Sequence, residues 1–142
     1  MNRPVWVEAE SNKIGDLHLP VELWQSMKAA SVVELHVPLA DRTRHLLDEY
    51  RHFTEQPEQL KALLHRLRYR LGSGVVDEWC SDIDAGRWER FVQNVLDQHY
   101  DPAYERSARR SFPNLTETID TTTSPDVVGH LLRIPLHSSV TC

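Results

Sequence analysis

Carboxylate and hydroxyl side chains follow directly after the first apolar segment of the chain. The stretch PVWVEAESNKIG (residues 4–15) begins with β-favouring residues and continues into Glu8, Glu10, Ser11 and Lys13. Residues 4–9 predict a short buried strand. In open α/β sheets, ligands bind at the carboxyl ends of strands, so these side chains would lie in a crevice suited to chemistry. They would be equally ordinary as surface residues at a strand end, and their types leave both interpretations open.

Two arginines lie early in a segment with helical periodicity, residues 39–53. Arg42 and Arg44 flank Thr43, with Asp41 beside them. Guanidinium groups can bind a phosphate or diphosphate through two parallel hydrogen bonds. The alternative is a solvated helix face with local ion pairs, which the sequence alone favours. Either way, Arg42 and Arg44 are candidates for a phosphate-side crevice.

Basic and aromatic residues further along the chain are candidates for RNA contacts. No acidic residue lies between Gln59 and Val76, a stretch that carries Lys61, Arg66, Arg68 and Arg70. Such a run could contact phosphates and make binding salt-dependent, although a solubilising helix face is the commoner explanation. Tyr100, Tyr104 and Arg106, followed by Arg109 and Arg110, form a second group. The tyrosines could stack on bases, but packing is the usual role of such spacing.

The composition is that of a globular protein with a single domain. The 142 residues are 40% hydrophobic and 26% charged, with a formal net charge of −5, so there is no global attraction to nucleic acid. Neither a membrane span nor a secretory signal is present, which predicts a cytoplasmic protein without membrane contact. The two cysteines, Cys80 and Cys142, form no CxxC pair, and the eight histidines are scattered. We therefore expect no disulfide framework, no metal and no tightly bound cofactor.

The order of the elements predicts an α/β fold. Strands are expected over residues 4–9, 32–37 and 116–120, and helices over 20–30, 39–53, 57–71, 75–85, 87–99 and 124–133. Residues 100–104 (YDPAY) predict a turn, and residues 107–115 a loop. Strands separated by helices favour a parallel sheet. We expect one domain over 1–142, with a parallel sheet of about three strands and a large helical insertion at about 39–106.

Four motifs in order resemble a known family. VWVEAESNKIGDLHLPVELWQSM resembles a segment of tRNA 2-selenouridine synthases that follows their phosphate loop, and VPLADRTRHLLDEYRHF resembles their paired-arginine segment. LKALLHRLRYRLG and VLDQHYDPAYERS resemble an Arg-Leu-Gly helix end and a Tyr-Asp-Pro-x-Tyr motif. Together they cover about residues 4–107, and the remainder matches only in layout. The resemblance implies a P-loop-like fold, although the sequence contains no GxxxxGK[ST] loop.

The resemblance also implies an activity. The family replaces the sulfur of wobble 2-thiouridine in tRNA with selenium, through a geranylated intermediate, using geranyl diphosphate and selenophosphate. The tRNA anticodon region would then be the partner. By position, Glu8, Glu10 and Ser11 would line the phosphate side of the crevice, and Arg42 and Arg44 would bind diphosphate or RNA. The family's catalytic cysteine belongs to a rhodanese-like domain, and its role is not transferred to Cys80.

These 142 residues include neither a rhodanese-like domain nor a phosphate loop. We therefore expect the C-terminal part of a synthase P-loop domain, arising from a truncated gene, a split gene or an incomplete sequence, and inactive alone. Three alternatives remain open: a stand-alone RNA-binding module, one half of a split synthase whose partner chain supplies the rhodanese domain and the phosphate loop, or a non-functional remnant.

Overall fold

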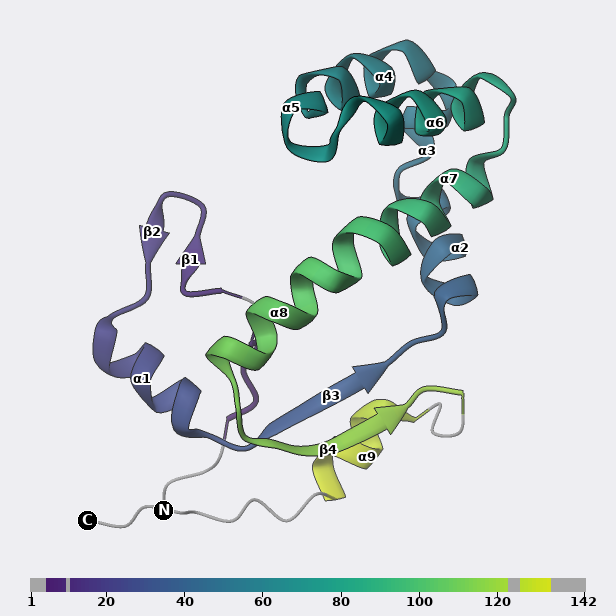
Figure 1. Cartoon of the computed structure of the whole chain (residues 1–142). Coiled ribbons are helices and arrows are strands. Elements are labelled where there is room, and N and C mark those ends of the chain that lie inside the picture. Colours follow the sequence, from purple (N-terminus) through teal and green to yellow (C-terminus); the bar gives the residue numbers. More distant parts are fainter. Residues whose placement is uncertain (1–4, 10, 123–125, 134–142) are drawn as a thin grey trace, which may run out of the picture. The chain divides into compact units, whose positions relative to one another are not determined.

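The structure, a computed structural model, describes residues 5–9, 11–122 and 126–133 (Figure 1). The chain divides into two compact units. Unit 1 comprises Met1–Val37 and Tyr104–Cys142, and unit 2 comprises Pro38–Ala103. The whole is a mixed α/β structure that is mostly helical.

Unit 1 is built on a parallel pair of strands. β3 (Val32–His36) pairs with β4 (Leu115–Asp120), with Leu35 opposite Ile119 and a register irregularity between Val32 and Val33. Both strands confirm the sequence predictions, as do the helices α1 (Val21–Ala29) and α9 (Val127–Arg133). Ile119 is buried, and the ring of Trp24 on α1 meets Phe112 edge-on at 5.2 Å between centroids. The predicted Ser124 cap of the last helix lies outside the described residues.

The predicted strand at residues 4–9 is wrong for the part that the structure describes. Residues 5–9 have no regular secondary structure, and Val5 and Val7 are 80% and 56% exposed. A strand needs a neighbour to satisfy its backbone N–H and C=O groups. Among the described residues, β3 pairs only with β4, so the parallel sheet has two strands in place of about three.

A small hairpin follows, which the sequence analysis did not predict. β1 (Lys13–Ile14) pairs antiparallel with β2 (Leu17–His18). Gly15 has φ of +59°, a conformation that a two-residue hairpin turn requires and that glycine adopts readily. The Gly-Asp dipeptide between the apolar residues Ile14 and Leu17 was the available signal.

Unit 2 is helical, with its apolar core between neighbouring helices. The helices are α2 (Leu39–Glu49), α3 (Arg51–Glu55), α4 (Pro57–Arg66), α5 (Arg68–Leu71), α6 (Ser73–Asp84) and α7 (Trp88–Val95). The predicted helices 39–53 and 57–71 each break once, at Tyr50 and at Leu67. The buried core consists of Leu64, Val76, Trp79, Ile83 and Phe91. On α6, the core residues Val76, Trp79 and Ile83 recur at helical spacing, which explains why this helix forms.

The predicted turn at residues 100–104 is wrong because the chain stays helical there. A π-helical turn, η1 (Leu96–Tyr100), leads straight into α8 (Asp101–Ser111), which also replaces most of the predicted loop. The N–H of Asp101 bonds to the carbonyl of Leu96, five residues earlier. Pro102 carries no N–H and would crowd an ordinary α-helix, and the wider π turn just before it absorbs the mismatch.

Replacing Gly72 tests the junction between α5 and α6. Gly72 has φ of +90°, and a Cβ added there would meet nothing within 4 Å. The cost of Gly72→Ala is therefore backbone strain alone, and we expect a loss of about 1–2 kcal/mol in urea unfolding followed by circular dichroism. Gly74→Ala, inside α6 and equally uncrowded, is the matched control and should stabilise by about 0.5–1 kcal/mol. Equal effects for both variants would contradict the assignment.

Candidate functional site

The acidic segment is not at a strand end. Glu8 is exposed on the irregular stretch 5–9, and Glu10 lies outside the described residues. The hydroxyl oxygen of Ser11 accepts a hydrogen bond from the backbone N–H of Lys13 at 3.0 Å, at the start of the β1–β2 hairpin. The strand-end crevice inferred for these residues is therefore corrected, while their role toward phosphate stays a prediction.

Arg42 and Arg44 do not converge. The guanidinium of Arg42 donates two hydrogen bonds to the carboxylate of Asp101, at 2.8 and 2.6 Å, and both side chains are about 30% exposed. The bond from Arg42 holds the pKa of Asp101 below its ordinary value, because it stabilises the ionised form. Arg44 is exposed and pairs with Asp41 at 3.0 Å. The local ion pair offered as the alternative is thus present for Arg44, whereas Arg42 pairs with a residue far along the chain, and the phosphate role of both stays a prediction.

The basic run from Lys61 to Arg70 divides into two groups. The Nζ of Lys61 lies 2.5 Å from Asp84 and 2.7 Å from Glu58, and these carboxylates raise the pKa of Lys61. Arg68 pairs with Asp77. Lys61 and Arg68 are seven residues apart, as are Asp77 and Asp84 on α6, so the two pairs are rungs between antiparallel helices.

The other two arginines of the segment, Arg66 and Arg70, make no ion pair within the described residues. Arg66 and Arg70 are exposed, and no acidic side chain in the described part of the chain pairs with either. Between them in the sequence, Tyr69 is 84% exposed, more than any other large hydrophobic side chain that the structure describes.

The second predicted RNA group lies along η1 and α8. Tyr100 and Tyr104 are nearly half exposed, and Arg106 is exposed. Both tyrosines make further interactions with their surroundings. Because these residues lie on a continuous helix and not in a turn, they cannot be presented as a flexible loop. Their contact with RNA stays a prediction.

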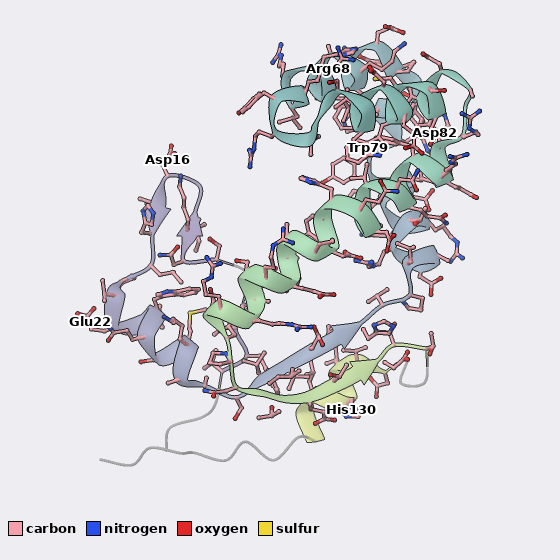
Figure 2. The ribbon with its side chains drawn as sticks, in the orientation of Figure 1. Asp16, Glu22, Arg68, Trp79, Asp82 and His130 are labelled. Carbon is pink, nitrogen blue, oxygen red and sulfur yellow. The ribbon has the colours of Figure 1, made fainter. Side chains whose placement is uncertain are left out.

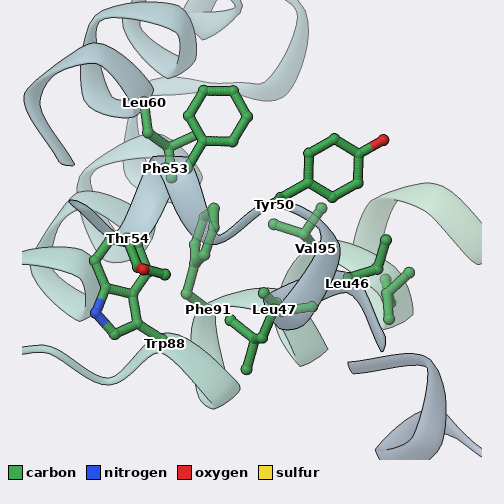
Figure 3. A pocket seen from close by; sticks show the side chains of 11 residues that line it. Leu46, Leu47, Tyr50, Phe53, Thr54, Leu60, Trp88, Phe91 and Val95 are labelled. Carbon is green, nitrogen blue, oxygen red and sulfur yellow. The ribbon is translucent and has the colours of Figure 1, made fainter. Parts of the chain in front are cut away.

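An apolar cavity of about 150 Å³ lies within unit 2 (Figure 3). Aromatic and aliphatic side chains line it, and its edge carries the half-exposed ring of Tyr50. The lining residues are Leu46, Leu47, Tyr50, Phe53, Thr54, Leu60, Trp88, Phe91, Val92, Val95 and Leu96. Periodicity could show the apolar faces of the separate helices, but not that a space stays open between them.

The carboxyl end of the parallel sheet carries residues that the sequence analysis missed. His36 and Asp120 are register partners at the ends of β3 and β4. The carboxylate of Asp120 accepts hydrogen bonds from the hydroxyl and the backbone N–H of Thr122, at 2.5 and 2.9 Å, which lower its pKa. Ligands of open α/β sheets bind at this end. The available signal was a carboxylate as the last residue of a predicted strand.

Cys80 and Asp82 of α6 have surroundings that suit a role in holding the fold together. Burial raises the pKa of the Cys80 thiol, which disfavours the reactive thiolate. The buried carboxylate of Asp82 accepts a hydrogen bond from Arg87 Nε at 2.8 Å and lies 3.4 Å from Arg90 Nε (Figure 2). It ties α6 to α7. Within residues 5–9, 11–122 and 126–133, no three His, Cys, Asp or Glu side chains gather to hold a metal, and no helix is long and apolar enough to cross a membrane.

The fold defines a mixed α/β domain in which a helical unit interrupts the chain between two parallel strands. The family model described as "tRNA 2-selenouridine synthase AAA domain" matches residues 1–128. The chain belongs to this family, as the sequence motifs predicted, and an AAA domain is consistent with a P-loop-like fold.

Two relatives agree. A tRNA 2-selenouridine synthase of Pseudomonas fluorescens Pf-5 is 27% identical over 123 residues, covering 69% of this chain and 34% of the relative. One of Shewanella loihica PV-4 is 31% identical over 129 residues, covering 72% and 35%. The chain therefore spans about a third of the length of these curated relatives. No solved structure matches.

Proposed function

We propose that this chain acts in tRNA modification as part of a cytoplasmic tRNA 2-selenouridine synthase, replacing the sulfur of wobble 2-thiouridine with selenium. The observation that carries the proposal is the family match over residues 1–128. In this proposal the reaction passes through a geranylated intermediate, with geranyl diphosphate and selenophosphate as substrates and the tRNA anticodon region as partner.

The apolar cavity of unit 2 is the place that we assign to the geranyl group. Its lining is aliphatic and aromatic, which suits a hydrocarbon chain. An apolar cavity of about 150 Å³ can hold a molecule the size of benzene, so the distal isoprene unit would fit and the rest would extend toward the mouth. No charged side chain lines it, so the diphosphate would lie outside.

The 142 residues by themselves are proposed not to complete the exchange. They include no GxxxxGK[ST] loop for the phosphates, and the raised pKa of Cys80 does not suit it to nucleophilic chemistry. A further domain or a separate chain would supply the rhodanese-like cysteine and the phosphate loop.

Nucleoside analysis of tRNA from the source organism tests the function. Disrupting the gene should remove 2-selenouridine from tRNA digests, with 2-thiouridine retained, as measured by mass spectrometry. A gene carrying Val92→Phe, which fills the cavity, should not restore geranylated or selenated tRNA, whereas Glu89→Phe on the exposed side of α7 should.

The two arms separate the claims. Persistence of 2-selenouridine after disruption would overturn the proposed function. Full rescue by Val92→Phe would overturn only the assignment of the cavity to the geranyl group.

A further inference from the structure

The structure divides the basic segment of α4 and α5 into a face that is neutralised and a face that is open. Lys61 and Arg68 are held by carboxylates of Glu58, Asp77 and Asp84. These cations help to join α4 and α5 to α6. Because the neighbouring carboxylates offset their positive charge, they attract an anionic ligand only weakly. The basic surface that remains open to a ligand is therefore much smaller than the whole basic segment.

The open face consists of Arg66, Tyr69 and Arg70. Leu67 separates α4 from α5 with a tighter turn, in which its N–H bonds to the carbonyl of Leu64 and its carbonyl accepts from the N–H of Arg70. Residues three apart align in such a 3₁₀-type turn, so Arg66 and Tyr69 lie on one side of it, and Arg70 follows directly. Two exposed arginines therefore lie next to a tyrosine that is 84% exposed.

We propose that Arg66, Tyr69 and Arg70 form a docking surface for unpaired RNA, with the Tyr69 ring stacking on a splayed base and the arginines contacting adjacent phosphates. The proposal rests on the proposed function, since it names where the tRNA loop is held. It assigns the RNA contact to α4 and α5 in place of Tyr100, Tyr104 and Arg106.

The chemistry of the surface favours this partner. Aromatic rings stack on unpaired bases regardless of sequence, and each such contact contributes about 1–3 kcal/mol. Base-specific proteins read RNA mostly in loops, where bases are unstacked. The chain has a formal net charge of −5, so attraction to phosphate must come from a local group such as this one.

A protein partner is the main competitor. Leu63 and Leu67 are 42% and 39% exposed beside the arginines, and an acidic protein surface could cover them. An exposed tyrosine between two uncompensated arginines is nevertheless better matched by a base between two phosphates. Binding of RNA at this face is directly measurable.

The test is a fluorescence anisotropy titration of the 142-residue chain with a labelled tRNA anticodon stem–loop. Tyr69→Ala should weaken binding about tenfold, and Tyr69→Phe, which keeps the ring, should bind within about twofold of wild type. Arg66→Gln with Arg70→Gln should weaken binding about tenfold. It should also lower the slope of log Kd against log salt by about 1.4, since each phosphate contact to single-stranded RNA releases about 0.7 counterion on binding and two contacts are removed.

The matched control removes the same charge elsewhere. Lys28→Gln with Arg51→Gln, at exposed positions of α1 and α3, should leave binding within about twofold. Binding that is unchanged in the Tyr69 and arginine variants, no binding by the wild-type chain, or equal loss in this control would each overturn the proposal. The readout is independent of selenation, so failure of the proposed function would show in tRNA digests and not here.

Discussion

Replacing Trp79 with alanine is expected to lower the free energy of unfolding of unit 2 by about 3–5 kcal/mol. Trp79 is 1% exposed and is the largest fully buried side chain. Its ring meets Phe91 edge-on at 6.1 Å between centroids and lies 6.3 Å from His99. Removing the ring opens a cavity between α6 and α7. The fold then loses the free energy gained by transferring the ring out of water, and also the packing contacts of the ring.

Two further variants identify the cause. The indole N–H of Trp79 has no hydrogen-bond partner among the described residues. Trp79→Phe deletes that buried donor while keeping a ring, so it should destabilise clearly less than alanine. Tyr69→Ala is the exposed aromatic control and should change stability by less than about 0.5 kcal/mol.

The measurement is urea unfolding followed by helical circular dichroism, which reports mainly on unit 2 because that unit is all helical. If Trp79→Ala were no less stable than Tyr69→Ala, the core assigned to unit 2 would be wrong.

Breaking the pair between Arg42 and Asp101 should also lower the free energy of unfolding of unit 2. Arg42→Met leaves the Asp101 carboxylate without its two-bond partner. A hydrogen bond to a charged group contributes about 1.5–3 kcal/mol, and the partial exposure of both side chains reduces the expected loss to about 1–2 kcal/mol at pH 7. Asp41→Asn, which removes the exposed partner of Arg44, should cost less than about 0.5 kcal/mol.

The effect of the pair should depend on pH in one direction. The pKa of Asp101 is lower in the folded state than its ordinary value near 4, so its contribution is fully present above about pH 4. This contribution to stability is lost as the pH falls through the folded-state pKa of Asp101. The reason is that the carboxylate takes up a proton at a higher pH in the unfolded state than in the folded state, so acid favours the unfolded state. The stability gap between wild type and Asp101→Asn should narrow below pH 4 in urea titrations, and a gap that widened would contradict the pairing.

Local pattern predicted most elements but not their neighbours. The strands at 32–37 and 116–120 followed from β-branched residues, and α4 from a leucine stripe that begins at Pro57. Residues 5–9 have the same apolar character, yet a strand also requires a partner, which local sequence does not supply. Pro102 predicted a break, but the π turn before it lets the helix continue.

The candidate site was predictable in residue type and not in pairing. Arg42 was singled out, but its partner Asp101 lies far along the chain, and no periodicity specifies the register between two helices. The sequence showed the basic run from Lys61 to Arg70. Which of its cations are paired and which are open depends on Asp77 and Asp84 of α6, and this could not be predicted. The cavity was missed because it is a space between side chains of several helices, each of which looks ordinary by itself.

The pair between Arg42 and Asp101 also bears on the order in which the chain folds. Before unit 2 forms, pairing β4 with β3 closes a loop of about 80 residues. Once unit 2 has formed and Arg42 is paired with Asp101, only about 20 residues outside that pair remain free between the two strands. The entropic cost of closing the loop is then lower by about 1.2 kcal/mol. Contacts between successive helices are short in sequence and form quickly, and parallel strands far apart in sequence pair slowly. We therefore expect the helical insertion to form early in folding and the pairing of β3 with β4 to follow it.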